Sequence, residues 1–268
     1  MPRLAVIGFP VAHSRSPAMQ NAALEALGLA GEWSYRAVEA TPAAFEMTVR
    51  ELASLGYAGV NVTVPHKEAA LKLADEASEA ARQIGAANTL SFAGKRIAAG
   101  NTDAEGLLRS LPEALRGEGL RGRRALVLGA GGAARAVLWA LVGAGAEVAV
   151  WNRTAERAER ICAELGGSPV AEPDQGEQAL IVNTSAAGLK GEDPFEHLPL
   201  SRGRFGAEQT VVDMVYGERP SQLLEAAAAA GAATVDGLEV LVQQGALSLR
   251  IWTGLEPPIE VMRAAVRR

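Results

Sequence analysis

Lys67 and Asp103 are the residue types best suited to proton transfer in this chain of 268 residues. Lys67 follows the turn at Pro65, and Asp103 lies at the beginning of a predicted helix. A neighbouring carboxylate favours the charged form of a lysine, so the pair suits an acid better than a base. Reduction of a ketone needs such an acid, because a proton must reach oxygen as hydride reaches carbon. His66, beside Lys67, is an alternative proton donor.

Further polar residues cluster at predicted strand ends, where ligands bind in open α/β sheets. They are Ser14, Ser16, Asn61, Thr63, Asn88, Thr102 and Asp103. Asn61 and Thr63 alternate along an apolar strand, so both side chains point to one face, where a ligand would explain them. For Ser14, Ser16 and Asp103, helix capping is the alternative interpretation.

A glycine-rich turn follows the apolar residues 125–128 and precedes an apolar helix. The turn comprises Gly129, Ala130, Gly131, Gly132 and Ala133. Gly129 permits a tight turn, and Gly131 lets backbone amides approach a pyrophosphate. Ala134 is small enough for the helix to pack closely on the strand. The free N–H groups of the helix N-terminus would then face the phosphates, so the segment predicts a dinucleotide-binding site.

The end of the next strand indicates which dinucleotide binds. Where an NAD enzyme carries an acidic residue for the ribose hydroxyls, this chain has Asn152, Arg153 and Thr154, with Arg157 one turn later. A guanidinium pairs with a 2′-phosphate, which a carboxylate would repel. We therefore expect NADP as the cofactor. The alternative is a solvated helix start, capped by Asn152 or Thr154.

Composition limits the remaining possibilities. A net charge of −5 without basic clusters argues against nucleic acid as a partner. Hydrophobic residues make up 49% of the chain, yet no apolar run is long enough to span a bilayer, and the N-terminus has no signal-peptide pattern. We therefore expect a cytoplasmic protein without membrane contact. Cys162 is expected in the core, and no metal site is expected.

The first hundred residues alternate strand and helix signals, which is typical of a mostly parallel sheet covered by helices. Strands are expected at residues 4–8, 34–38, 59–64, 88–92 and 96–100, and helices at 17–27, 42–55, 66–73, 78–84 and 103–111. Gly94 predicts a hairpin between the last two strands. The stretch 116–124, rich in Gly and Arg, is expected to be a linker.

The second half predicts a Rossmann-type sheet. Strands are expected at residues 125–128, 147–151, 180–183, 210–215 and 234–236, and helices at 135–142, 155–165, 238–252 and 258–266. Residues 186–204 are expected to form a loop. From periodicity alone, the last two helices could pack on either half of the chain.

These motifs together resemble the shikimate dehydrogenase family along essentially the whole chain. The resemblance is carried by residues 14–17, 61–67, 85–89, 100–103, 129–133, 152–154, 183–185, 213–216 and 237–244. It implies NADPH-dependent reduction of 3-dehydroshikimate to shikimate in aromatic amino-acid biosynthesis, with Lys67 and Asp103 as the catalytic pair.

The resemblance also implies roles for other residues. The substrate carboxylate would contact Ser14, Ser16 and Tyr216, and the substrate hydroxyls would contact Thr63, Asn88 and Gln244. Further residues on the cofactor side would be Glu79, Thr184, Ser185, Met214 and Gly237.

The family fold implies an α/β protein of two domains. Residues 1–103 and 238–268 would form the substrate-binding and catalytic domain, to which the C-terminal helices return, and residues 104–237 the NADP-binding Rossmann domain. Family members occur as homodimers and as monomers. Three alternatives stay open: a quinate-tolerant relative, a folate-linked methylene dehydrogenase and a non-catalytic NADP-sensing module. The first would use NAD with an acid near Asn152, the second lacks the Ser14, Ser16 and Tyr216 set, and the third needs no Lys67 or Asp103.

Overall fold

The computed structural model describes residues 2–217 and 220–267, which divide into two compact units. Unit 1 comprises Met1–Gly106 and Leu241–Arg268, and unit 2 comprises Leu107–Val240. The boundaries fall inside two helices, α5 (Asp103–Ser110) and α9 (Gly237–Thr253). The linker expected at residues 116–124 is therefore wrong. Leu120 within it is fully buried in the core of unit 2, so the stretch is part of that unit.

The sheet of unit 1 has the strand order β2-β1-β3-β5-β6-β4. Its strands are β1 (Arg3–Gly8), β2 (Ser34–Glu39), β3 (Tyr57–Val62), β4 (Glu76–Ala77), β5 (Thr89–Ala93) and β6 (Arg96–Gly100). Strand β5 runs antiparallel to both neighbours, and the other pairs are parallel. The expected hairpin at Gly94 is confirmed, with a positive φ of 60° there. The edge strand β4 was not predicted, because two residues leave no periodic signal.

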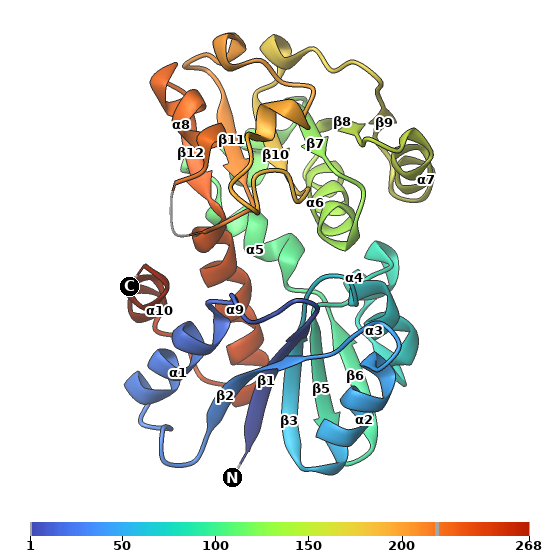
Figure 1. Ribbon diagram of the computed structural model, residues 1–268, viewed down its shortest axis with the longest axis vertical. Coiled ribbons are helices and arrows are strands. Elements are labelled where there is room, and N and C mark those ends of the chain that lie inside the picture. Colours follow the sequence, from blue (N-terminus) through green and yellow to red (C-terminus); the bar gives the residue numbers. More distant parts are fainter. Residues whose placement is uncertain (1, 218–219, 268) are drawn as a thin grey trace. The chain divides into compact units, whose positions relative to one another are not determined.

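Helices cover both faces of this sheet. They are α1 (Ser16–Ala26), α2 (Phe45–Ser54), α3 (Lys67–Leu73), α4 (Glu79–Ile84) and α10 (Ile259–Val266), with the later part of α9. Figure 1 shows α1, α9 and α10 on one face and α2 and α3 on the other. Val60 and Val62 of β3 pack on the α2 side, so Asn61 between them faces α9. The expected return of the C-terminal helices to the first domain is confirmed.

The sheet of unit 2 is parallel, with the strand order β12-β11-β10-β7-β8-β9. Its strands are β7 (Arg124–Leu128), β8 (Glu147–Trp151), β9 (Ser168–Pro169), β10 (Leu180–Asn183), β11 (Thr210–Asp213) and β12 (Ala233–Asp236). The order is that of a Rossmann fold, as expected. The strand order reverses between β7 and β10, and dinucleotides bind at such a point.

Apolar side chains alternate along these strands and bury both faces of the sheet. Helices α6 (Gly132–Gly143) and α7 (Ala155–Leu165) cover one face, and α8 (Gln222–Ala229) covers the other (Figure 1). Cys162 is buried in the core between the sheet and helices α6 and α7, as expected. Residues 186–204 form a loop with short 3-10 helices. Among the described residues, no helix is long and apolar enough to cross a membrane.

Candidate active site and dinucleotide site

Lys67 and Asp103 form a buried ion pair in unit 1. Lys67 Nζ donates a hydrogen bond to Asp103 Oδ2 over 2.8 Å, and the two side chains are 11% and 6% exposed. Each residue is the first of a helix, α3 and α5, so backbone folding rather than sequence proximity brings them together. The carboxylate also lies at a helix N-terminus, which stabilises negative charge. The ion pair therefore places the Lys67 ammonium, which can donate a proton, inside the protein.

Asn88 fixes the second oxygen of this carboxylate. Its Nδ2 donates to Asp103 Oδ1 over 2.9 Å, while its Oδ1 accepts from the backbone N–H of Thr102 over 2.8 Å. A backbone N–H can only donate, so the oxygen must face Thr102 and the amide nitrogen must face Asp103. Asn88 Nδ2 also lies 3.2 Å from Gln244 Oε1. Four predicted site residues therefore meet in one cluster.

Asn101 and Gly106 shape the beginning of α5 beneath this cluster. Asn101 Oδ1 accepts from the backbone N–H groups of Asp103 and Ala104 at 3.0 and 3.4 Å. The idea that Asp103 caps the helix is therefore wrong, and its carboxylate is free for Lys67. One turn later, a Cβ on Gly106 would lie 2.8 Å from Gln244 N, so α5 and α9 approach closely only because Gly106 has no side chain.

His66 has a structural role that conflicts with its alternative role as proton donor. Its ring stacks on Phe45 at 4.5 Å between ring centroids, and Nε2 lies 2.7 Å from the carbonyl oxygen of Ala40. The side chain is only 2% exposed. One ring face and Nε2 are thus committed to the fold of unit 1, so Lys67 is the better donor.

Ser14 and Ser16 lie at the beginning of α1. Ser14 Oγ accepts from the backbone N–H of Ser16 at 3.3 Å, and no side chain caps the helix at Arg15. Capping of α1 by these serines therefore consists of one long hydrogen bond. The remaining N–H groups at the helix N-terminus can still bind an anion. Gln20, one turn later, donates to the carbonyl oxygen of Gly245, next to Gln244.

A ligand is not needed to explain Asn61, because its amide finds partners inside unit 1. Asn61 Oδ1 accepts from Tyr35 Oη over 2.8 Å, and Nδ2 donates to Ser248 Oγ over 2.8 Å. Thr63 lies just beyond β3, where its methyl group leaves no room for a Cβ on Gly8, and it is partly exposed. A substrate contact of Thr63 stays a prediction.

The glycine-rich turn of unit 2 has the geometry that a pyrophosphate needs. Gly129 has a φ of 118°, and a Cβ there would lie 2.6 Å from Thr184 Oγ1. Gly131 precedes α6 with open space where a Cβ would project. Ala134 is fully buried against the strand core. The chain therefore fits a dinucleotide at the N-terminus of α6.

Cationic side chains stand free at the end of β8. Arg153 and Arg157 are exposed, and within the described residues neither has an ion-pair partner. Asn152 Nδ2 donates to the carbonyl oxygen of Thr154 over 2.8 Å, and no side chain caps α7 at Thr154. Neither Asn152 nor Thr154 therefore caps α7, while the exposure of Arg157 agrees with a solvated helix start. A contact of the two guanidinium groups with an anion stays a prediction.

Asn183 and Asp213 tie together the ends of β10 and β11. Asn183 Nδ2 donates to Asp213 Oδ1 over 2.9 Å, and Asn183 Oδ1 accepts from Ser185 Oγ over 2.7 Å. Asp213 Oδ1 also accepts from the backbone N–H of Val215, and Oδ2 accepts from Ser221 Oγ. These contacts hold the backbone next to Thr184, Ser185 and Met214, which are predicted cofactor residues. Sequence reasoning missed both Asn183 and Asp213 as anchors.

Burial raises the pKa of the Asp213 carboxyl, although hydrogen bonds from Ser221, Val215 and Asn183 oppose the effect. Because the folded protein then holds this proton to higher pH than the unfolded chain, Asp213 lowers the free energy of unfolding as pH rises through that pKa. We expect Asp213→Asn to gain stability relative to the wild type as pH rises above about 4, the pKa of an aspartate in an unfolded chain, because Asn stays neutral and can donate to Ser221 Oγ. Thermal unfolding across this range measures the difference.

Asp193→Asn is a control of opposite sign. Hydrogen bonds from Phe195 N and the Arg202 guanidinium lower the pKa of Asp193, so its stabilisation is present at neutral pH and lost in acid. This variant should lose stability relative to the wild type as pH rises. Parallel curves for Asp213→Asn and the wild type would show that the buried carboxyl does not titrate in this range.

Three further predicted residues are Gly237, Glu79 and Tyr216. A Cβ on Gly237 would lie 2.6 Å from the carbonyl oxygen of Met214, so these two residues adjoin. Glu79 is exposed on α4 of unit 1 and accepts from Gln83 Nε2. Tyr216 follows β11 in unit 2. Contacts of Glu79 and Tyr216 with ligands stay predictions.

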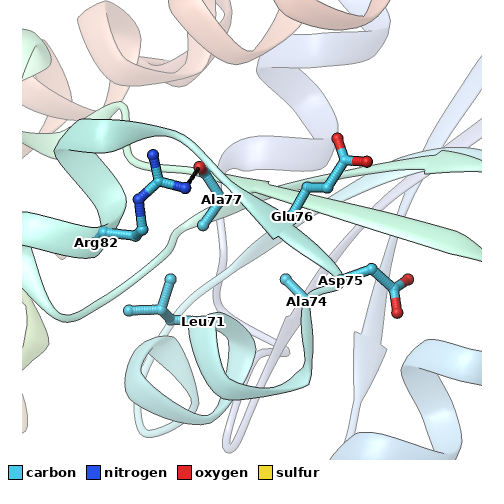
Figure 2. Close-up of a pocket in the computed structure, with 6 residues that line it drawn as sticks. All are labelled: Leu71, Ala74, Asp75, Glu76, Ala77 and Arg82. Carbon is cyan, nitrogen blue, oxygen red and sulfur yellow. Dashed lines mark hydrogen bonds between the residues drawn. The ribbon is translucent and has the colours of Figure 1, made fainter.

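A depression of about 510 Å³ at the edge strand β4 contains none of the predicted residues. It is lined by Leu71, Ala74, Asp75, Glu76, Ala77 and Arg82 (Figure 2). Arg82 donates to the carbonyl oxygen of Ala77, and Glu76 pairs with Arg96. Figure 2 shows the carboxylates of Asp75 and Glu76 pointing in different directions. Polar groups do not converge there, so it is not a candidate active site.

Comparison with known families gives matches in both units. The family model described as "Shikimate dehydrogenase substrate binding domain" matches residues 6–90. The model described as "Shikimate / quinate 5-dehydrogenase" matches residues 113–180, and "Shikimate 5'-dehydrogenase C-terminal domain" matches residues 237–267.

Individual proteins are similar over nearly their full lengths. A shikimate dehydrogenase (NADP(+)) of Methanopyrus kandleri is 42% identical, with 97% of this chain and 93% of the relative covered. The crystal structure of a shikimate 5-dehydrogenase from Thermus thermophilus, in complex with NADP(H) and shikimate, has a TM-score of 0.88 and 43% identity, covering 100% and 99% of the two chains. A shikimate dehydrogenase structure from Aquifex aeolicus has a TM-score of 0.92 and 39% identity, covering 100% and 98%.

Proposed function

The chain belongs to the shikimate dehydrogenase family, and we propose that it catalyses the reversible reduction of 3-dehydroshikimate to shikimate with NADPH. The observation that carries this proposal is the buried Lys67–Asp103 pair, with Asn88 and Gln244 beside it. A non-catalytic NADP-sensing module gives no reason to bury a charged pair, whose desolvation is unfavourable. The step belongs to aromatic amino-acid biosynthesis.

Unit 1 binds the substrate in this proposal. The N-terminus of α1, with the hydroxyls of Ser14 and Ser16, provides donors for the substrate carboxylate. Tyr216, which belongs to unit 2, is proposed as a third hydroxyl for the carboxylate. Thr63, Asn88 and Gln244 hydrogen-bond the hydroxyl groups of the ring, because their side chains both donate and accept.

Unit 2 binds NADP. The turn at residues 129–133 and the N-terminus of α6 hold the pyrophosphate, and Arg153 with Arg157 pairs with the 2′-phosphate. Asn152 and Thr154 lie beside the 2′-phosphate, Thr184 and Ser185 line the cofactor strand, and Met214 and Gly237 lie on the nicotinamide side. Glu79 is the one cofactor residue proposed from unit 1. The bound cofactor supplies the hydride.

Lys67 is the acid in the reducing direction. Its ammonium donates a proton to the carbonyl oxygen of the substrate as negative charge develops there. Asp103 holds the ammonium in place through the 2.8 Å hydrogen bond. In the reverse direction, the neutral amine accepts the proton of the alcohol.

One steady-state assay tests this function against its competitor. Shikimate and quinate are each offered with NADP and with NAD, and reduced cofactor is followed by its absorbance. We expect shikimate with NADP to give the highest kcat/KM. Faster turnover of quinate with NAD would support a quinate dehydrogenase, and no turnover of any pair would contradict the proposal.

Homodimer formation and a cytoplasmic location are further proposals, which size-exclusion chromatography and cell fractionation test.

The hydroxyls of Ser14 and Ser16 give a prediction about binding rather than chemistry. We expect Ser14→Ala, Ser16→Ala and Tyr216→Phe each to raise the KM for shikimate more than they lower kcat. A hydrogen bond to a carboxylate far from the reacting carbon contributes about 1–3 kcal/mol to ground state and transition state alike. Steady-state kinetics measure the split. A fall in kcat at unchanged KM would instead assign these hydroxyls to positioning.

A further inference from the structure

A continuous row of hydrogen bonds in unit 1 runs from Tyr35 to Asp103. The successive distances are 2.8 Å from Tyr35 Oη to Asn61 Oδ1, 2.8 Å from Asn61 Nδ2 to Ser248 Oγ, 2.9 Å from Ser248 Oγ to Thr89 Oγ1, 3.0 Å from Thr89 Oγ1 to Asn88 Oδ1, and 2.9 Å from Asn88 Nδ2 to Asp103 Oδ1. Every residue in the row is buried, and Ser248 is fully so. All of these hydrogen bonds therefore join protein groups that are buried from solvent.

The direction of each hydrogen bond follows from groups that can play only one role. Asn61 Nδ2 lies 3.2 Å from the carbonyl oxygen of Asn88, which can only accept, so Asn61 Oδ1 faces Tyr35 and the phenol donates. The contact of Asn88 Oδ1 with Thr102 N identifies this atom as the amide oxygen, which can only accept hydrogen bonds. Thr89 therefore donates to it. Thr89 has then used its proton and can accept from Ser248.

Ser248 completes the row. Its oxygen accepts from Asn61, and its own proton has a contact of 2.9 Å to Thr89, against 3.1 Å to Thr102 Oγ1 and 3.1 Å to the carbonyl oxygen of Gln244. When Ser248 donates along its contact with Thr89, every donor from Tyr35 onward points toward the Asp103 carboxylate. Hydrogen bonds aligned in this way polarise and strengthen one another in a low-dielectric interior.

We propose that Asn61, Ser248 and Thr89 are positioning residues for proton transfer. Thr89 Oγ1 donates to Asn88 Oδ1, which also accepts from Thr102 N, and Ser248 and Asn61 hold Thr89 Oγ1 in place. Thr89 thus acts together with Thr102 N to keep Asn88 Nδ2 on Asp103. The carboxylate is thereby held by Asn88 on one oxygen and by Lys67 on the other, which fixes the direction of the ammonium. This inference rests on the proposed function, because it assigns to these groups the orientation of the same acid pair.

Thr89 offers a matched pair of variants. Thr89→Val keeps the shape but removes the hydroxyl, whereas Thr89→Ser keeps the hydroxyl and removes the methyl group. We expect Thr89→Val and Ser248→Ala to lower kcat about 10-fold to 100-fold with a smaller change in KM, as for a misplaced catalytic group. Thr89→Ser should retain kcat within about threefold of the wild type. Equal losses in Thr89→Val and Thr89→Ser would overturn the proposal in favour of packing.

The double variant Thr89→Val with Ser248→Ala tests whether the two hydroxyls act in one row. If they do, breaking the row twice should lower kcat no further than the more harmful single change. Losses that multiply would contradict a single row. Thermal unfolding of each variant measures the folded fraction, and a fall in kcat that follows this fraction alone would also overturn the proposal.

An NMR measurement separates the proposal from the function on which it rests. Hydrogen exchange of the Asn88 side-chain amide is followed in the substrate-free protein, where the wild type should be protected and Thr89→Val and Ser248→Ala should not. Unchanged exchange in both variants would overturn the row even if the wild type reduces 3-dehydroshikimate. A wild type that is inactive but protected would contradict the proposed function and leave the row supported.

Discussion

Lys67→Ala is expected to lower kcat by about 10²–10⁴-fold while the KM for shikimate changes by less than about tenfold. The ammonium is the acid within the buried pair, so its loss removes proton delivery and little ground-state binding. Steady-state kinetics with NADP and shikimate measure both constants. Near-normal turnover would contradict the role of Lys67 and transfer it to His66 or water.

This variant needs a test of folding, because Asp103 would be left buried without its cation, which is strongly destabilising. Binding of NADPH, followed by its fluorescence, reports whether unit 2 is intact, and thermal unfolding reports the whole chain. His66→Gln is the matched control, since His66 is adjacent in sequence but stacks on Phe45. We expect it to lower stability, yet to keep kcat per folded molecule within about tenfold, because it removes no acid from the reaction.

Arg153→Ala is expected to weaken NADPH binding by roughly 2–4 kcal/mol while NADH binding changes little. The exposed guanidinium has no ion-pair partner among the described residues, so its loss removes the proposed contact to the 2′-phosphate and no ion pair within the fold. Adding Asn152→Asp should then repel the 2′-phosphate and favour NADH. Steady-state constants for both cofactors decide between these outcomes.

Arg160→Ala is the matched control for this prediction. Arg160 is also exposed on α7, but it lies farther from the end of β8 than Arg153. Its removal should leave the ratio of NADPH to NADH affinity unchanged. Equal losses for NADPH and NADH in Arg153→Ala would show that Arg153 supports the fold or the adenine instead of the phosphate.

The fold was predictable wherever apolar periodicity extends over a whole element. The strands at residues 4–8 and 147–151 and the helix at 155–165 agree with the structure within a residue. Periodicity fails for β4 and β9, which have two residues each. It also fails at residues 116–124, where glycines and arginines suggested a linker although Leu120 is buried. Glycine composition reports flexible backbone, not where a core ends.

The candidate site was predictable in part, because chemistry-bearing residue types at strand ends give a signal. That signal found Lys67, Asp103 and Asn88, which lie in contact. It did not find Ser248, although this residue lies one helical turn after Gln244 and shares its helix face. In the sequence, a single serine among the apolar residues of a helix gives no sign of a functional role. Its role depends on a hydrogen bond to Asn61, which is 187 residues away along the chain.

The discontinuity of unit 1 has a consequence for the order of synthesis. Its sheet is complete by Gly100, but the row of hydrogen bonds that ends on Asp103 needs Ser248 from Leu241–Arg268. Since domains fold as units while the chain emerges from the ribosome, unit 2 can finish before unit 1 does. A nascent chain that ends after Val240 therefore contains the glycine-rich turn for the dinucleotide. It lacks Ser248, and with it the hydrogen bonds that hold Asn88 beside the Lys67–Asp103 pair. Full enzymatic activity is therefore expected only when the last helices have been made.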